Sequence, residues 1–167
     1  FAICGRTESK LKESKKDIEN FARIQDCNAN LIVQRVDVSE RSEIEQFISR
    51  VVERCGQIDH VLCNAGISFG SDFDLVRVNI LGTMGTVEIV KETSPQARFV
   101  LFSSLAGFAP LPHQEYGENA AVYAATKRFL IEYGLKLQQE GLKVTIICPG
   151  FIRERSGCCT YTYSSGA

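Results

Sequence analysis

The sequence predicts an α/β domain built on a doubly wound parallel sheet. Short apolar runs of β type alternate with longer stretches of helical periodicity, which is typical of parallel strands joined by helical crossovers. The chain has 167 residues, of which 44% are hydrophobic and 23% charged, so it can bury one core. No internal repeat or low-complexity tract interrupts the pattern. We therefore expect one soluble globular domain.

The expected strands are short, and the expected helices follow them in turn. Strands are predicted at residues 1–4, 31–36, 59–63, 99–103 and 143–148, and helices at 7–24, 39–55, 73–91 and 120–139. Ser39 is the expected N-cap of the second helix. Residues 67–71 and 107–119 are expected to be loops, and 153–167 an irregular tail without periodicity.

Charge and hydropathy exclude several classes of partner. Nineteen basic and twenty acidic side chains leave a formal charge of −1, which provides no electrostatic footprint for nucleic acid or an anionic membrane surface. No apolar run reaches the roughly 18 residues needed to span a bilayer. The chain begins inside an apolar run without an initiator methionine, so a targeting segment or anchor ahead of Phe1 would not be visible. We expect a small-molecule partner.

The seven cysteines do not predict a metal site. They show no C-x-x-C spacing, and the chain has only two histidines, His60 and His113, that could complete a zinc site. Cys4, Cys63 and Cys148 lie in apolar runs, where cysteine behaves as a small buried hydrophobe. A reducing, cytoplasmic environment is therefore expected.

Tyr123 and Lys127 are the first candidates for chemistry. Their spacing of one helical turn places both side chains on one face of the helix expected at 120–139. A nearby ammonium favours the phenolate form of tyrosine. An ordinary tyrosine has a pKa near 10, so for Tyr123 to act as a base near neutrality its phenolate must be stabilised by about 4 kcal/mol. Alone, the pair also fits an ordinary helix surface. Upstream, however, the strand expected at 99–103 ends in Ser103 and Ser104, at the edge where ligands of parallel sheets bind.

Five motifs in order carry a resemblance to a known family. They are Asn64-Ala65-Gly66, Val78-Asn79-Ile80-Leu81-Gly82-Thr83, Ser103-Ser104-Leu105-Ala106-Gly107, Tyr123-Ala124-Ala125-Thr126-Lys127 and Pro149-Gly150. In this order they resemble the short-chain dehydrogenases/reductases, over residues 1–152. The resemblance implies a partial NAD(P)-binding domain of Rossmann-like fold over that range, a carbonyl or alcohol substrate, and a homo-oligomer that packs, when complete, through the helices at 73–91 and 120–139.

The resemblance also implies a role for each catalytic candidate. Tyr123 would be the general acid/base. Lys127 would lower the tyrosine pKa and bind the nicotinamide ribose, and Asn79 would kink its helix and anchor a proton-relay water. Ser104 would hold the substrate oxygen, because the family's serine precedes x-x-Gly and Gly107 fits that offset.

Two of these assignments have structural alternatives. Ser103, which is not chosen as the catalytic serine, would be a strand-end hydroxyl. Asn79 would otherwise be a helix-interior asparagine that is satisfied locally.

Cofactor choice follows from the end of the strand expected at residues 1–4. Ile3-Cys4-Gly5-Arg6-Thr7 carries an arginine and no acid, so Arg6 favours the 2′-phosphate of NADP(H) over NAD(H), the alternative being a solvated arginine. Asp37 and Val38 resemble the adenine-contacting pair, although Asp37 would also suit a cap for the helix near Ser39. The remaining cofactor residues implied by the resemblance are Asn64, Ala65, Gly66, Tyr123, Lys127, Pro149, Gly150 and Ile152.

The sequence departs from the family pattern in several places. The G-x-x-x-G-x-G turn that cradles the pyrophosphate is absent from the chain, as are the first strand that precedes it and the last strand. Because that first strand is central in the 3-2-1-4-5-6 order, we expect an incomplete sequence and a sheet split between residues 1–4 and 59–63. Cys63 occupies a place where the family often has asparagine, and Glu154 stands near a usual threonine.

Three functions remain open. The first is an NADP(H)-dependent carbonyl reductase or alcohol dehydrogenase. The second is a noncatalytic fragment or scaffold, favoured by the missing turn but opposed by the presence of all four catalytic candidates. The third is an extended-branch nucleotide-sugar epimerase or dehydratase, favoured by the long spacing of nineteen from Ser104 to Tyr123.

Overall fold

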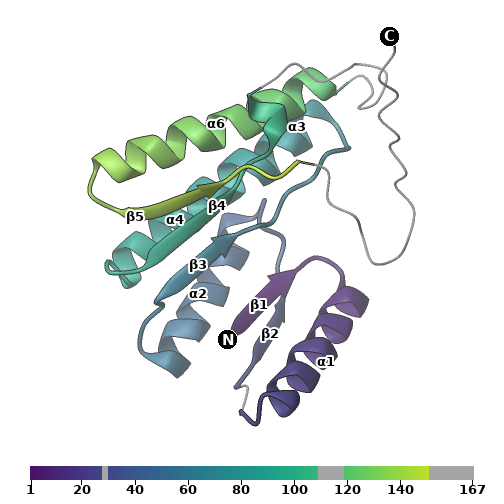
Figure 1. Ribbon diagram of the computed structural model, residues 1–167, viewed down its shortest axis with the longest axis vertical. Coiled ribbons are helices and arrows are strands. Elements are labelled where there is room, and N and C mark those ends of the chain that lie inside the picture. The colour runs from purple at the N-terminus through teal and green to yellow at the C-terminus, as the bar shows by residue number, and fades with distance from the viewer. Residues whose placement is uncertain (28–29, 109–118, 151–167) are drawn as a thin grey trace.

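The computed structural model describes residues 1–27, 30–108 and 119–150 of the chain (Figure 1). The strands are β1 (Ala2–Gly5), β2 (Ile32–Arg35), β3 (His60–Cys63), β4 (Arg98–Phe102) and β5 (Lys143–Ile147). The main helices are α1 (Glu8–Ile24), α2 (Arg41–Cys55), α4 (Gly82–Thr93) and α6 (Ala120–Gln139), with short helical segments α3 (Asp72–Leu75), Val76–Leu81 and Leu105–Gly107. Every predicted strand and helix is present, with ends within two residues of those expected.

The parallel strands form two separate sheets. β1 pairs with β2 in one, and β3, β4 and β5 pair in that order in the other. Within the described residues no strand joins β1 to β3, and Figure 1 shows the two groups lying apart. The fold is a Rossmann-like α/β arrangement, and the predicted split of its sheet is confirmed.

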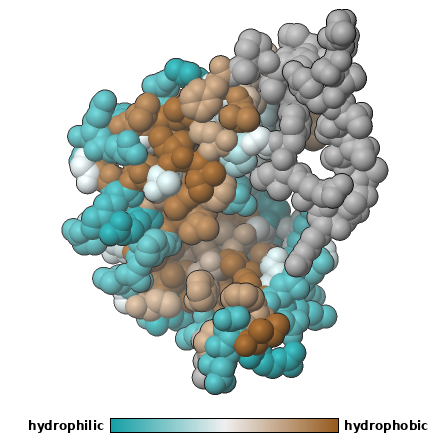
Figure 2. Space-filling model, viewed as in Figure 1, coloured by the Kyte–Doolittle hydropathy of each residue, from teal (hydrophilic) through white to brown (hydrophobic). Residues whose placement is uncertain are grey.

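The core lies between the three-stranded sheet and the helices that cover one of its faces. Phe99 and Leu101 of β4 point into it at 2% and 0% exposure, and they meet buried side chains of α2, α4 and α6. Side chains alternate along the strands, so Leu62 of β3 and Ile147 of β5 lie on the opposite face of the sheet. That face is exposed, and it appears as a brown region in Figure 2. Apolar burial on one face therefore holds α4 and α6 in position beneath the ends of the strands.

The helix predicted at 73–91 is continuous but changes its winding. It begins at a capping box, in which the Ser71 hydroxyl accepts the Asp74 amide at 3.1 Å and the Asp74 carboxylate accepts the Ser71 amide at 3.3 Å. Val76–Leu81 then forms a π-helix, and α4 continues from Gly82. A π-turn inserts an extra residue and redirects the side chains within it, which is frequent at functional sites.

The predicted N-cap of α2 is wrong. The helix begins at Arg41 with Glu40 in the cap position and no side-chain cap bond. Ser39 instead donates its hydroxyl and its amide to Asp37 Oδ1, at 2.8 and 2.9 Å. A charged acceptor two residues upstream binds more strongly than a helix amide would bind the serine, so the pair forms a local turn and neither residue is the cap.

Some predictions lie outside the described residues. These include the middle of the loop expected at 107–119, the tail at 153–167, and with them His113, Ile152 and Glu154. In the part of the chain that the structure describes, no helix combines the length and apolar character required to cross a bilayer.

Candidate active site

The candidate site forms where the carboxyl ends of β3, β4 and β5 meet. Parallel pairing brings these ends to one edge of the sheet, so Asn64, Ser103 and Cys148 follow the last residues of neighbouring strands. Helix α6 contacts both β4 and β5 and carries Tyr123 and Lys127 in its first turns. The predicted catalytic helix and strand ends therefore come together.

Lys127 is the most buried charge in this region. The residue is only 7% exposed, and its Nζ donates a 3.0 Å hydrogen bond to the carbonyl oxygen of Phe102. Burial lowers the pKa of Lys127. Nζ also lies 5.8 Å from the centre of the Tyr123 ring, and Tyr123 itself is half-buried. The structure thus places the ammonium beside the phenol, as their spacing on the helix predicts.

The two adjacent serines have different partners. The Ser103 hydroxyl is buried and donates to the carbonyl oxygen of Lys127 at 2.6 Å, so it ties the end of β4 to α6. Ser104 is half-buried and accepts the amide of Ala106 at 3.2 Å, as the N-cap of Leu105–Gly107. A hydroxyl that accepts one hydrogen bond still has its own proton to donate. Ser104 therefore keeps a donor at the edge of the sheet.

Asn79 lies within the π-helix and is 1% exposed. Its Oδ1 accepts the amide of Ile67 at 2.8 Å, and its Nδ2 donates to the Ile67 carbonyl at 2.9 Å and to Thr126 Oγ1 at 3.1 Å. These partners are 12 and 47 residues away, so the alternative of a locally satisfied asparagine does not describe its contacts. Asn79 instead connects the loop after β3 to helix α6.

Gly66 lies between Asn79 and Lys127. A Cβ at this position would lie 3.3 Å from Asn79 Oδ1 and 3.4 Å from Lys127 Nζ, tighter than most real contacts. Asn64 and Ala65, which precede it, are exposed. The glycine lets the backbone approach the buried Asn79 amide and the Lys127 ammonium closely.

Pro149 and Gly150 lie beside the segment that follows Ser104. The carbonyl oxygen of Pro149 accepts the amide of Leu105 at 2.9 Å, and a Cβ on Gly150 would lie 3.2 Å from Leu105 Cδ1. The predicted Pro-Gly pair therefore lies at the same edge of the sheet as Ser104.

The residues expected at the adenine side follow β1 and β2. Asp37 is partly buried, which raises its pKa, but its hydrogen bonds from Ser39 and the charges of Arg6 and Arg35 outweigh burial and hold the pKa below the usual value. Arg6, exposed at the end of β1, is thus near enough to act on the Asp37 carboxylate. The amide of Asp37 donates to Glu43 Oε2 at 2.8 Å.

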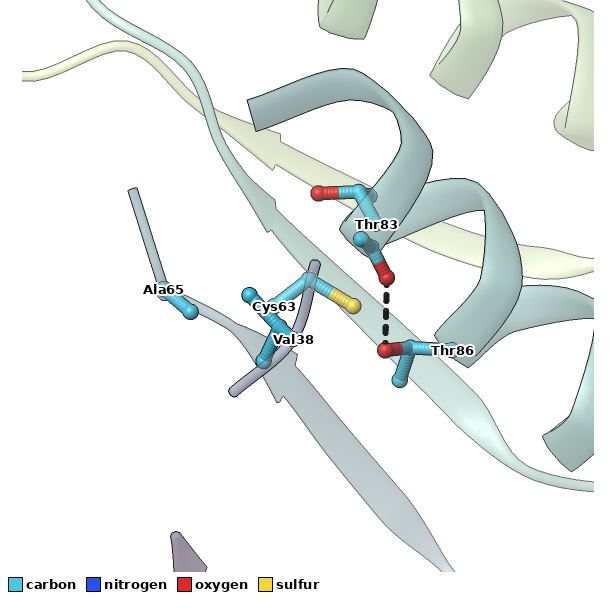
Figure 3. Close-up of a pocket in the computed structure, with 6 residues that line it drawn as sticks. Val38, Cys63, Ala65, Thr83 and Thr86 are labelled. Atoms are coloured by element: carbon cyan, nitrogen blue, oxygen red, sulfur yellow. Dashed lines mark hydrogen bonds between the residues drawn. The ribbon is translucent and has the colours of Figure 1, made fainter. Parts of the chain in front are cut away.

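Val38 contacts the helix that carries Asn79. A small cavity of about 20 Å³ lies between the loop after β2, the end of β3 and α4, and Figure 3 shows the Cys63 side chain pointing toward α4 there. Its lining combines two predicted cofactor residues, Val38 and Ala65, with four residues that were not predicted to bind the cofactor: Cys63, Gly82, Thr83 and Thr86. Gly82 belongs to the motif Val78 to Thr83, and the close packing of α4 against Val38 gives the structural reason for a glycine there.

The residues present fit the nicotinamide ribose side of a dinucleotide. An ammonium has three N–H groups, and among the described residues the recorded acceptor of Lys127 Nζ is the Phe102 carbonyl. The other N–H groups of the ammonium would be available to hydroxyl groups of a bound ribose. Lys127 and Tyr123 are the residues that would hold that part of the cofactor.

The chain is similar to known oxidoreductases along most of its length. The family model described as short chain dehydrogenase matches residues 1–157. A peroxisomal 2,4-dienoyl-CoA reductase of Saccharomyces cerevisiae is 27% identical over 169 residues, covering 93% of this chain and 56% of the yeast protein. An uncharacterized oxidoreductase of Staphylococcus saprophyticus is 29% identical over 168 residues, covering 90% of this chain and 66% of its own length.

Solved structures agree with these relatives. A variant of actinorhodin polyketide ketoreductase with NADPH matches at a TM-score of 0.76 and 25% identity, over 90% of this chain and 60% of the other. An NAD⁺-bound xylitol dehydrogenase, at a TM-score of 0.76 and 18% identity over 89% of this chain and 59% of the other, shares the fold. The chain thus spans between about half and two thirds of these proteins. It belongs to the short-chain dehydrogenase family.

Proposed function

We propose that this chain forms the catalytic part of an NADP(H)-dependent oxidoreductase that interconverts a carbonyl and an alcohol. The observation that carries the proposal is the buried Lys127 ammonium, 5.8 Å from the Tyr123 ring at the carboxyl edge of the sheet. A ketoreductase with NADPH among the structural neighbours supports the reaction class.

The proton transfer belongs to Tyr123. In the reductive direction its O–H bond breaks and a new O–H bond forms on the carbonyl oxygen, while the Ser104 hydroxyl donates a hydrogen bond to that oxygen. A bound nicotinamide dinucleotide supplies the hydride to the carbon or, in the oxidative direction, accepts it. Tyr123 takes the proton back when the alcohol is oxidised.

Lys127 stabilises the tyrosine after the proton has left. Burial penalises the isolated ammonium, which is why its pKa is lowered. A negative charge that develops on the tyrosine oxygen offsets that penalty, since opposite charges attract more strongly away from water. The same penalty makes the ammonium a good donor to ribose hydroxyls.

Cofactor preference rests on Arg6. The residues around it at the end of β1, Gly5 and Thr7, carry no acidic group that would hydrogen-bond a ribose 2′-hydroxyl. Asp37 stays charged because its pKa is lowered, and Asp37 and Val38 are the residues proposed to contact the adenine. NADP(H) is therefore the proposed cofactor.

The test uses the complete gene product that contains this chain. NADPH absorbance is followed with ketones, aldehydes, quinones and sugar nucleotides for the wild type, Tyr123→Phe and Tyr133→Phe. Loss of the general acid should reduce kcat by about a hundredfold or more. Tyr133→Phe is the matched control, because Tyr133 is in the same helix but stacks on Phe129 in the core. A Tyr123→Phe protein with wild-type kcat would contradict the proposal.

The same assay separates the other candidates. A noncatalytic module predicts that no substrate oxidises NADPH. Turnover confined to sugar nucleotides would indicate the epimerase or dehydratase branch instead.

A further inference from the structure

The Thr126 hydroxyl is buried between the two halves of the candidate site. Thr126 is 1% exposed and lies in α6 between Tyr123 and Lys127. Its Oγ1 donates to the carbonyl oxygen of Tyr123 at 2.8 Å and accepts a hydrogen bond from Asn79 Nδ2 at 3.1 Å. Both hydrogen-bonding capacities of one hydroxyl are therefore used, one within α6 and one toward the π-helix.

The Asn79 amide is held on one side by Ile67 and on the other by this hydroxyl. Nδ2 has two N–H groups, and its recorded acceptors are the Ile67 carbonyl and Thr126 Oγ1, while Oδ1 accepts the Ile67 amide. Because the Thr126 hydroxyl donates its hydrogen bond to the carbonyl oxygen of Tyr123, it acts as the acceptor in its bond with Asn79. The direction of the whole chain of bonds, from Asn79 through Thr126 to the Tyr123 carbonyl, is thus determined.

Two other threonines in the helices that the structure describes, Thr86 and Thr93, make the first of these bonds. Thr86 donates to Gly82 at 2.8 Å and Thr93 to Ile89 at 2.9 Å, each within its own helix. Thr126 differs because a residue 47 positions away donates to it. Its hydroxyl therefore joins α6 to the element that carries Asn79, at the turn that carries Tyr123.

We propose that Thr126 is a positioning residue, which holds Tyr123 and Lys127 at a defined distance and rotation from Asn79. The proposal rests on the oxidoreductase function above. Without the hydroxyl, a buried N–H of Asn79 loses its acceptor, which is costly, and α6 loses the bond that fixes it relative to Asn79. The phenol then shifts relative to the reacting oxygen, whereas the contacts proposed for the cofactor at Arg6 and Asp37 lie outside α6 and are unchanged.

The experiment compares three variants of the complete gene product, Thr126→Val, Thr126→Ser and Thr93→Val. Kinetics with NADPH give kcat and KM separately, and thermal unfolding reports the fold. Thr126→Val keeps the shape but removes the hydroxyl, and it should lower kcat by about tenfold or more with KM for NADPH within about twofold. Thr126→Ser restores the hydroxyl and should recover kcat to within about threefold. Thr93→Val removes a helical back-bond far from the site and should leave kcat unchanged.

The outcomes distinguish this proposal from the function on which it rests. If the wild type is inactive, or Tyr123→Phe is fully active, the proposed function fails. If Tyr123→Phe is inactive but folded Thr126→Val has wild-type kcat, the positioning role is overturned. Should Thr126→Val not fold, Thr126→Ala replaces it. Failure of both to fold beside a folded, active Thr126→Ser would show a purely structural role and also overturn the proposal.

Discussion

Lys127 Nζ donates a 3.0 Å hydrogen bond to the carbonyl oxygen of Phe102, the last residue of β4. Lys127 is four residues after Tyr123, and the bond holds its ammonium at the edge of the sheet, where the residue is 7% exposed. Removing an ammonium from water is costly, and its lowered pKa expresses that cost. Burial of the Lys127 ammonium therefore lowers the stability of the fold but places a cation beside Tyr123.

Lys127→Met tests both effects. We expect kcat of the complete gene product to fall by about a hundredfold or more, because the cation beside Tyr123 is lost. Burial depresses the folded-state pKa of Lys127 below its unfolded value, so more protons are bound in the unfolded state between the two values. Wild-type stability should therefore gain, relative to Lys127→Met, as the pH rises toward the ordinary lysine value of 10.5.

Urea unfolding of both proteins at pH 7 and pH 10 measures that difference. An unfolding free-energy difference that is the same at both pH values would contradict the burial of a charged Lys127.

Arg6→Ala tests the cofactor preference. If Arg6 binds the 2′-phosphate, its loss should raise KM for NADPH by about tenfold or more and leave KM for NADH within about twofold. Arg35→Ala is the matched control, since Arg35 is also exposed at the end of a strand, 3.8 Å from Glu43. An unchanged ratio of the two KM values in Arg6→Ala would show that this arginine is merely solvated.

Gly82→Ala tests the contact between α4 and the loop after β2. An added Cβ would lie 2.8 Å from the carbonyl oxygen of Val38, so backbone must move, and we expect a loss of about 1–3 kcal/mol in unfolding free energy. Gly85→Ala, three residues further along α4, meets Ile44 Cδ1 at an ordinary 3.6 Å. It should be neutral or stabilising by up to about 1 kcal/mol, because alanine favours helix. Equal losses in the two variants would show that the Val38 contact is not tight.

Cys63 should resist alkylation in the folded protein. Burial raises the pKa of its thiol to about 12, with Cys4 adding to the shift, so almost no thiolate is present at pH 8. Cys27 and Cys55 are exposed and provide internal controls. Mass spectrometry after treatment with iodoacetamide should find label on both controls before Cys63. Equal labelling at early times would mean that the cavity beside α4 opens readily.

Local sequence accounts for most of the secondary structure and fails where a distant or charged partner competes. Helix α6 was predicted to the residue, because apolar periodicity runs from Ala120 to Gln139. The Ser39 cap was wrong because the Asp37 carboxylate takes its hydroxyl and amide. The π-helix at Val76–Leu81 was not predicted, because nothing in a local period reveals that Asn79 will bind Ile67 and Thr126.

The sequence by itself determined the order of strands and helices, and it placed Tyr123 and Lys127 on one face of a helix at the carboxyl edge of the sheet. Periodicity suffices for this, since it decides which side chains share a face. Only the tertiary structure decided that Ser103 is tied to α6 while Ser104 faces the edge, and that Lys127 is buried against Phe102. Those outcomes depend on which elements pack together and on which buried polar groups must then be paired, neither of which a local pattern contains.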